Sequence, residues 1–351
     1  MVNNLFRRVL ITGGCGFIGA NLVLFLIKQG FKRIRILDNL STGTKDNLEE
    51  SLSEFGKAVA VKHHDGLIYE LQNKLRSEEN EKVQIELLIG DIQSYDTCFD
   101  ATEEVNSIVH LAAHAGVIPS IKDPFYDFEI NARGTLNLLQ AAYKNKVDKF
   151  LFASSNAPLG DQGPPMSEEL APKPVSPYGA SKLSCEGYCS AFSGSYGFKT
   201  IVFRFSNVYG PYCLHKDSVV SKFIKDGFSK GVLTIYGDGT QTRDFLYVED
   251  LCRVISNVLQ MENFSNSPDV WGEVFHLGTG KETSIINLAN IIKKLFTKDI
   301  QVIHEPERKG EIKRNYSDIS KAINLLNYGE GIPLQKGVQN TFNWLKLKIE
   351  G

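Results

Sequence analysis

Tyr178 and Lys182 stand four residues apart at the start of a predicted helix, so their side chains share one helix face. A tyrosine phenol, with an ordinary pKa of about 10, is a poor base at neutral pH. A lysine ammonium beside it favours the phenolate, which can take a proton from an alcohol. Taken alone, such a pair is more often two surface neighbours. Here Ser154 and Ser155 follow the preceding predicted strand, 149–153, and this favours a catalytic role for Tyr178 and Lys182.

A glycine-rich turn near the N-terminus predicts a dinucleotide site. The apolar run 8–12 predicts a buried parallel strand, and apolar residues spaced three and four apart over 22–27 predict the helix that follows. Gly13 permits the tight turn, Gly16 lets the backbone approach a pyrophosphate, and Gly19 lets the helix pack close to the sheet. Free N–H groups and the dipole at the start of that helix favour a phosphate.

The second predicted strand, 33–37, selects between two dinucleotides. It ends at Asp38, nineteen residues after Gly19, where a carboxylate can accept hydrogen bonds from ribose hydroxyls. Because this carboxylate repels a 2′-phosphate, NAD is favoured over NADP. In the polar turn that follows, Ser41 and Thr42 are candidates to cap the next helix and to touch the adenosine.

Further predicted strands at 84–89, 107–110, 149–153 and 200–205 alternate with helical patterns, which predicts an open α/β sheet. Ligands in such sheets bind beyond the carboxyl ends of the strands. Asp91 follows the first of these strands, and an Asp there usually reaches toward an adenine amine.

Small residues and a histidine follow the strand 107–110. Ala112 and Ala113 leave room there for a flat ligand. We interpret His114 as a pocket-wall or solvent-facing residue, since no partner for it can be named from the sequence, and an acid or base role is the alternative.

After residue 206 the regular alternation ends. Short strands and helices there predict a smaller lobe woven in and out of the first one. We expect a doubly wound, mainly parallel α/β sheet formed by 1–206 plus 245–278, and a substrate lobe formed by 207–244 plus 279–351. The charged segment 44–83 is interpreted as an insertion of unknown use, with His63, His64 and the stretch 74–82 forming a solvated helix and loop.

The composition excludes several classes of function. Lysine plus arginine number 39 against 41 acids, so the net charge of −2 creates no field that would attract nucleic acid or an anionic membrane. The six cysteines show no CxxC pair and no grouping with histidine, so we expect neither a metal site nor disulfides. Neither a signal peptide nor an apolar run of about 20 residues is present, which predicts a cytoplasmic protein without a membrane partner.

Together these motifs resemble the extended short-chain dehydrogenases/reductases, and more narrowly the NAD-dependent nucleotide-sugar epimerases. The matching stretches, in chain order, are the glycine turn 13–19, Leu37-Asp38-Asn39-Leu40-Ser41-Thr42-Gly43, Gly90-Asp91-Ile92, His110-Leu111-Ala112-Ala113, Ser154-Ser155, Tyr178-Gly179-Ala180-Ser181-Lys182, 204–211, 236–245 and 306–311. They span nearly the whole chain in the order that the family has.

The resemblance assigns roles to individual residues. It makes Tyr178 the base, Lys182 its electrostatic partner and ribose ligand, and Ser155 the hydroxyl that shares the transferred proton. It implies NAD contacts by Gly13, Gly16, Phe17, Ile18, Gly19, Asp38, Asn39, Ser41, Thr42, Gly43, Asp91, Ile92, Leu111, Ala112, Ala113, Tyr178, Lys182, Phe205 and Val208. It implies substrate contacts by Ser155, Asn156, Tyr178, Asn207, Arg243, Arg308 and Asn315. Arginine forks suit phosphate oxygens, so two arginines fit a nucleotide diphosphate.

Two departures from the family pattern bear on the reaction. Family members that eliminate water from the sugar carry an Asp-Glu pair after the strand-end hydroxyl, and decarboxylases carry a Glu nearby. This chain has Asn156-Ala157, with no acid to protonate a leaving hydroxyl, which disfavours a dehydratase. It also has Pro158-Leu159 where the family usually has Val-Tyr.

The resemblance therefore implies a 4-epimerase that acts on a UDP-sugar through a 4-keto intermediate with tightly bound NAD, and implies a homodimer formed through helices near 94–104 and 122–145. Asn315 aligns with a position beside the second sugar carbon, where hexose-restricted members carry a bulky Tyr. Its small amide favours UDP-N-acetylglucosamine and UDP-N-acetylgalactosamine, or their uronic acids. The alternatives are a UDP-glucose or UDP-glucuronate 4-epimerase, a decarboxylase or reductase that uses the same intermediate, and a non-catalytic NAD-sensing protein.

Overall fold

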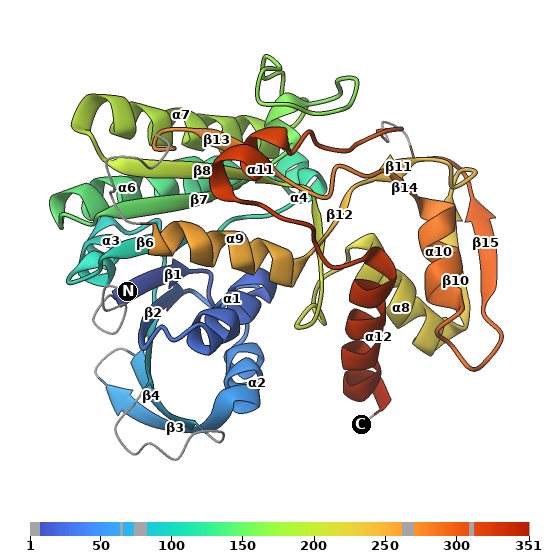
Figure 1. The fold of residues 1–351 in the computed structure, drawn as a ribbon, viewed down its shortest axis with the longest axis horizontal. Helices are drawn as coiled ribbons and strands as arrows, with labels where there is room; N and C mark the ends of the chain where they lie inside the picture. The colour runs from blue at the N-terminus through green and yellow to red at the C-terminus, as the bar shows by residue number, and fades with distance from the viewer. Residues whose placement is uncertain (1–7, 64–65, 74–82, 262–269, 309–311, 351) are drawn as a thin grey trace. The chain divides into compact units, whose positions relative to one another are not determined.

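A twisted sheet flanked by helices forms the larger part of the chain. The computed structural model describes residues 8–63, 66–73, 83–261, 270–308 and 312–350. The sheet has the strand order β13-β8-β7-β6-β1-β2-β5-β4-β3, which Figure 1 shows from β13 at the top to β3 at the bottom. Its strands are β1 (Arg8–Thr12), β2 (Arg33–Asp38), β3 (Gly56–His63), β4 (Gly66–Asn73), β5 (Val83–Ile89), β6 (Ser107–His110), β7 (Lys149–Ser155), β8 (Lys199–Phe205) and β13 (Val274–Leu277).

Pairing of β1 with β2 and β6, of β2 with β5, and of β6 with β7 is parallel throughout. The doubly wound, mainly parallel fold predicted from the sequence is therefore confirmed. Because β2 and β6 lie on opposite sides of β1, the chain reverses direction across the sheet there, and such a reversal opens a ligand crevice at the carboxyl ends of the strands.

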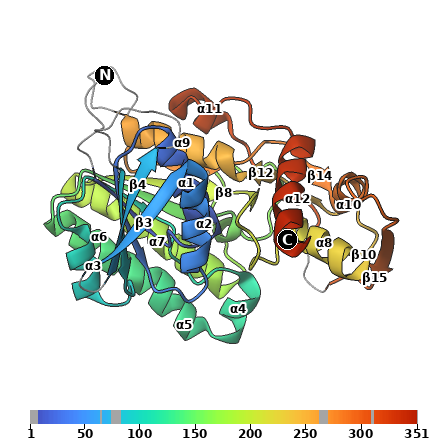
Figure 2. The same cartoon turned by 90° about the horizontal axis from the view of Figure 1, so that it is seen from below.

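The helices of this part cover the sheet and bury its apolar side chains. They are α1 (Phe17–Lys28), α2 (Lys45–Phe55), α3 (Tyr95–Thr102), α4 (Val117–Lys122), α5 (Pro124–Phe128), a π-helical turn (Glu129–Arg133), α6 (Gly134–Lys144) and α7 (Pro177–Tyr196), with a 3-10 turn at Ala157–Leu159. Figure 2 shows α3, α6 and α7 side by side, and α1 beside α2. One core cluster joins Ile108 and Phe150 of the sheet to Leu138 of α6 and Cys185 of α7, all fully buried.

Two strands within the segment 44–83 were not predicted from the sequence. β3 and β4 form an antiparallel hairpin that extends the sheet beyond β5, and the interpretation of His63 as part of a solvated helix and loop was wrong. In β4, Tyr69 and Leu71 are buried while Glu70 between them is exposed, the alternation of a strand with one covered face. His63 lies in β3, and residues 64–65 and 74–82 lie outside the described residues.

The contacts divide the chain into two compact units. The first comprises 1–160, 171–204 and 252–275, and the second comprises 161–170, 205–251 and 276–351. Compared with the predicted ranges, the second unit also includes 161–170 and 245–251, where β12 pairs with β9.

Short elements make up the second unit. They are β9 (Asn207–Tyr209), α8 (Val219–Lys230), β10 (Val232–Tyr236), β11 (Thr242–Arg243), β12 (Phe245–Tyr247), the start of α9 (Val248–Gln260), β14 (Thr283–Ser284), α10 (Ile285–Lys293), β15 (Gln301–Glu305), α11 (Ser320–Leu326) and α12 (Leu334–Glu350). The pairs β10–β15 and β12–β9 are parallel, and β11–β14 is antiparallel. Among the described residues no helix has the length and apolar character needed to cross a membrane.

Candidate active site

The predicted base and its partner stand at the start of α7. The Ser176 hydroxyl accepts a hydrogen bond of 3.1 Å from the Gly179 amide, and proline occupies the first helical position, so the helix begins there. Tyr178 and Lys182 are then one helical turn apart on one face. The Lys182 ammonium lies 5.9 Å from the centroid of the Tyr178 ring.

The buried Lys182 side chain reaches the sheet. Its ammonium donates a hydrogen bond of 2.9 Å to the carbonyl of Ala153 in β7 and lies 4.7 Å from the centroid of the Phe152 ring. Burial lowers the pKa of Lys182, while neighbouring acidic groups, among them Asp127, act in the opposite direction.

The predicted third member, Ser155, ends β7, and its hydroxyl accepts a hydrogen bond of 3.0 Å from the Ala157 amide. Desolvation raises the pKa of Tyr178 to about 12, and a hydrogen bond with Ser155 opposes this shift. Tyr178, Lys182 and Ser155 therefore form one cluster, and its phenol needs further positive charge before it can act as a base at neutral pH.

A glycine cradle follows β1. Gly13 has a φ of +71°, and a Cβ added to it would lie 2.9 Å from the Ala112 nitrogen. A Cβ on Gly19 would lie 2.3 Å from the Gly13 carbonyl oxygen, so the start of α1 packs directly on the turn. By contrast, a Cβ on Gly16 would meet only that same oxygen, at 3.3 Å, so this side of the turn is open to a ligand.

Asp38 ties the end of β2 to this cradle. Its carboxylate accepts hydrogen bonds of 2.9 Å from the amides of Cys15 and Leu40. Burial raises the pKa of Asp38, and these two amides oppose the shift. A Cβ on Gly43 would lie 2.6 Å from the Gly16 nitrogen, so the turn after β2 packs against the cradle.

Two predicted adenosine contacts, Asn39 and Asp91, lie together. The Asn39 amide donates a hydrogen bond of 2.8 Å to the Asp91 carboxylate. The cap of α2, however, is Thr44, whose hydroxyl accepts from the Asn47 amide at 3.1 Å, and the candidacy of Ser41 and Thr42 for this cap was wrong.

Except for Tyr178 and Lys182 on α7, the predicted NAD residues of the first unit lie at the ends of neighbouring strands. β1 is followed by Gly13, Gly16, Phe17, Ile18 and Gly19. β2 ends at Asp38 and is followed by Asn39, Ser41, Thr42 and Gly43. β5 is followed by Asp91 and Ile92, and β6 by Leu111, Ala112 and Ala113. An open glycine turn, a free helix start and a carboxylate at the second strand fit NAD. Phe205 and Val208 belong to the second unit.

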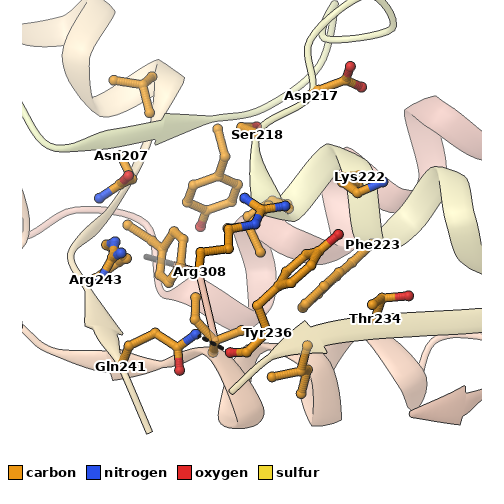
Figure 3. A pocket seen from close by; sticks show the side chains of 17 residues that line it. Asn207, Asp217, Ser218, Lys222, Phe223, Thr234, Tyr236, Gln241, Arg243 and Arg308 are labelled. Atoms are coloured by element: carbon orange, nitrogen blue, oxygen red, sulfur yellow. Dashed lines mark hydrogen bonds between the residues drawn. The ribbon is translucent and has the colours of Figure 1, made fainter. Parts of the chain in front are cut away.

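A cavity of about 470 Å³ lies in the second unit, between β9, α8 and β10 (Figure 3). Its lining includes the predicted substrate residues Asn207, Arg243 and Arg308, and also Val208. Arg308 stacks on Tyr236, with the guanidinium carbon 3.7 Å from the ring centroid.

Backbone carbonyls hold the side chains of Arg243 and Asn207 in this cavity. The Arg243 guanidinium donates to the carbonyls of Thr242 and Ile312 at 2.7 and 2.8 Å, and the Asn207 amide donates to the Asp244 carbonyl at 3.2 Å. Two arginines and an amide around one cavity fit a diphosphate, because charge-assisted hydrogen bonds to phosphate oxygens are strong.

Two predicted sugar-pocket residues lie elsewhere. Asn315 is half-buried in the segment after 311 and is not among the residues that line this cavity. The carbonyl of its neighbour Tyr316 accepts a hydrogen bond of 2.8 Å from the Met166 amide. Asn156 begins the 3-10 turn after β7, where Pro158 and Leu159 are buried.

Sequence reasoning missed two buried carboxylates near Lys182. The Glu186 carboxylate accepts a hydrogen bond of 2.5 Å from the Ser154 hydroxyl and two hydrogen bonds, of 2.7 and 3.0 Å, from the Arg204 guanidinium. Its position four residues after Lys182, on the same helix face, was a usable signal. The Asp127 carboxylate in α5 accepts a hydrogen bond from the Ser181 hydroxyl in α7. These two residues are far apart in the sequence, so no local spacing predicts the contact.

Comparisons with known proteins agree with this geometry. The chain matches the profile of the NAD dependent epimerase/dehydratase family over residues 9–278. It is 34% identical to a putative UDP-glucose 4-epimerase of Methanocaldococcus jannaschii over 96% of this chain and 98% of that protein. Its fold resembles the UDP-N-acetylglucosamine 4-epimerase of Methanobrevibacter ruminantium, crystallised with UDP-N-acetylmuramic acid (TM-score 0.81, 29% identity, 98% and 99% of the two chains). It also resembles the UDP-glucuronic acid 4-epimerase of Bacillus cereus, crystallised with UDP-glucuronic acid and NAD (TM-score 0.81, 28% identity, 97% and 100%).

Proposed function

The chain belongs to the NAD dependent epimerase/dehydratase family, and on this premise we propose that it is a UDP-sugar 4-epimerase. The observation that carries the proposal is the cluster of Tyr178, Lys182 and Ser155 with no acid at Asn156-Ala157. A phenol base suits removal of an alcohol proton, and elimination of water would need an acid for the leaving hydroxyl.

The protein's own residues move and hold the proton. Tyr178 takes it from the 4-hydroxyl, Ser155 shares it, and the Lys182 ammonium stabilises the phenolate. NAD, when bound, supplies the group that accepts a hydride from the sugar and returns it. Once the 4-keto sugar has turned over, the hydride would return to the opposite face of the fourth carbon, and Tyr178 would give the proton back to the 4-oxygen, so the product has the mass of the substrate.

The cavity of the second unit would hold the nucleotide while the sugar turns over. Arg243 and Arg308 offer guanidinium forks to the two phosphates, and Asn207 offers an amide. This anchoring matters because the 4-keto sugar must expose its other face without leaving the protein. Binding energy from the unreacting nucleotide is therefore used to retain the intermediate.

For the sugar, we propose UDP-N-acetylglucosamine and UDP-N-acetylgalactosamine, or their uronic acids. The support is the small amide of Asn315 at the aligned position. UDP-glucose and UDP-glucuronate are the alternative substrates, and the similarity to epimerases of both sugars supports keeping them.

Incubation of the NAD-loaded protein with each UDP-sugar, followed by chromatography and mass spectrometry, tests the proposal. A 4-epimerase gives a new peak of unchanged mass. Loss of carbon dioxide or net reduction identifies one of the other routes through the same intermediate, and no conversion of any UDP-sugar supports a non-catalytic NAD-binding protein.

We also propose a homodimer. Apolar side chains are exposed on α4 and α5 and the turn after them, with Ile118, Ile121, Phe125 and Phe128 between 51% and 82% exposed. Such a patch on a single chain marks an interaction site. Light scattering coupled to size-exclusion chromatography distinguishes a dimer from a monomer.

A further inference from the structure

Asp127 is a fully buried carboxylate beside the predicted base. Its two oxygens accept hydrogen bonds of 2.7 Å from the Ser181 hydroxyl and 3.0 Å from the Asn131 amide. Within the described residues neither a lysine nor an arginine forms an ion pair with it, and the basic side chain beside it is His114, whose Nδ1 lies 3.4 Å from the carboxylate. Burial of a charge that is held only by neutral hydrogen-bond donors destabilises the folded state. We therefore expect the Asp127 carboxylate to serve a function.

The carboxylate is attached to the turn of α7 that carries both predicted residues. Ser181 precedes Lys182 and follows Tyr178 by three positions, and its hydroxyl lies 3.1 Å from the Tyr178 carbonyl. Asn131 fixes the opposite side, because its amide group also exchanges hydrogen bonds of 2.9 and 3.0 Å with the backbone of His114.

The second buried carboxylate nearby is already neutralised. Both oxygens of Glu186 bind the Arg204 guanidinium, and the two side chains are each 5% exposed. Among the described residues, Asp127 has no arginine partner, so no positive charge of that kind offsets the effect of its negative charge on Lys182 and Tyr178. Its charge raises the pKa of both groups.

We propose that the Asp127 carboxylate is a positioning residue, the buried counter-charge that keeps Lys182 protonated and restrains loss of the Tyr178 proton. The inference rests on the proposed function, in which Tyr178 is the base. Titratable and charged groups that face this cluster come from the loop after β6, from β6 and from α7: His114, His110, Tyr178, Lys182, Cys185, Glu186 and Cys189.

Asp127→Asn removes the charge and keeps the hydrogen bonds. The new amide oxygen can accept from Asn131, and the new NH₂ can donate to the Ser181 hydroxyl, which then donates to the Tyr178 carbonyl. Asp123→Asn is the matched control, since Asp123 is an exposed acid that caps the same helix by accepting from the Tyr126 amide at 2.9 Å.

The experiment titrates tyrosinate absorbance in the NAD-loaded protein and subtracts the same titration of Tyr178→Phe. The titration begins above pH 7.5, about one unit above the ordinary histidine pKa. We expect Asp127→Asn to move the Tyr178 midpoint to lower pH by about half a unit or more, and Asp123→Asn to leave it in place.

An unchanged midpoint in folded Asp127→Asn overturns the inference, and so does an equal shift in Asp123→Asn. If Asp127→Asn does not fold, the smaller neutral variant Asp127→Ser takes its place. Failure of both to fold or retain NAD shows that the carboxylate is structural and also overturns it. The titration needs no substrate, so its result is independent of catalysis. If the midpoint shifts but no UDP-sugar is converted, the role of Asp127 as a counter-charge is supported and the proposed function is refuted.

Discussion

The Arg308 guanidinium lies over the Tyr236 ring, with its carbon 3.7 Å from the ring centroid, and so covers the face of an aromatic ring in the cavity of the second unit. A planar guanidinium can stack and still direct its N–H groups at an anion. The Gln241 side-chain amide donates a hydrogen bond of 2.8 Å to the backbone carbonyl of Tyr236 and so holds this residue in place. Under the proposed function, this arrangement would present a cation to the phosphates of the nucleotide.

Arg308→Ala should weaken binding of UDP by about 10–100-fold, the equivalent of one charge-assisted hydrogen bond at about 1.5–3 kcal/mol. Arg308→Lys should recover only part of this loss, because an ammonium neither stacks nor forks. Titration calorimetry with UDP measures both. Arg314→Ala is the control, since Arg314 is an exposed arginine of the neighbouring segment that pairs with Glu282. UDP affinity equal to wild type in Arg308→Ala would remove Arg308 from the nucleotide site.

Tyr178→Phe should lower turnover by roughly 10²–10⁴-fold, the usual contribution of a general base, while NAD stays bound. The reason is that the phenyl ring keeps the packing surface and loses only the hydroxyl that exchanges the proton. Turnover is measured by product chromatography, and NAD by its absorbance after denaturation of the protein. Near-normal turnover with full NAD content would refute the assignment of the base.

Asp38→Ala should weaken NAD binding and relax discrimination against NADP, because the repulsion of a 2′-phosphate disappears. Asp38 also accepts from the Cys15 and Leu40 amides, so part of the loss comes from a looser cradle. Asp38→Asn separates the two effects, since it can still accept one of these bonds. The test is a binding titration with both dinucleotides, and an unchanged ratio of affinities in both variants would count against the dinucleotide interpretation.

Sequence reasoning succeeded where the physical cause is local. The turn from Gly13 to Gly19 follows from backbone demands of a few residues, and the shared face of Tyr178 and Lys182 follows from helix geometry alone. Both features were predicted before any knowledge of tertiary contacts. Their predicted roles in catalysis remain to be tested by the variants above.

The failures lie where distant segments meet. The hairpin β3–β4 extends the sheet because β4 pairs with β5, and α2 lies against β4, where Glu49 accepts a hydrogen bond from the buried Tyr69. The charged residues of this segment concealed both contacts in the sequence. Likewise, Asp127 meets Ser181 across 54 positions, and a contact at that separation has no periodic signature. This is also why His114 had no nameable partner until the fold brought Asp127 beside it.

Stability should fall as pH drops below 6.5 because of His110, which is fully buried between Thr12 at 2.6 Å and Thr135 at 3.0 Å. Burial lowers the pKa of His110 to about 3, so the unfolded chain takes up a proton below pH 6.5 that the folded chain does not bind. Between pH 7 and pH 5 this costs about 2 kcal/mol.

His110→Gln should remove that part of the pH dependence, whatever its effect on stability at pH 7. Urea denaturation of both proteins at the two pH values gives the comparison. If the variant loses as much stability as wild type between pH 7 and pH 5, His110 is not the group responsible.

Asn315→Tyr should selectively suppress turnover of N-acetylated UDP-sugars, because a bulky ring would fill the space beside the second sugar carbon that an acetamido group needs. Turnover of UDP-glucose should change much less. The alignment is tested by Tyr316→Ala, since a one-residue slip would make Tyr316 the pocket residue, and that variant would then gain activity on N-acetylated sugars. Kinetics with UDP-glucose and UDP-N-acetylglucosamine decide the matter. A wild-type preference for UDP-glucose of tenfold or more, about 1.4 kcal/mol in the transition state, would refute the proposed pocket.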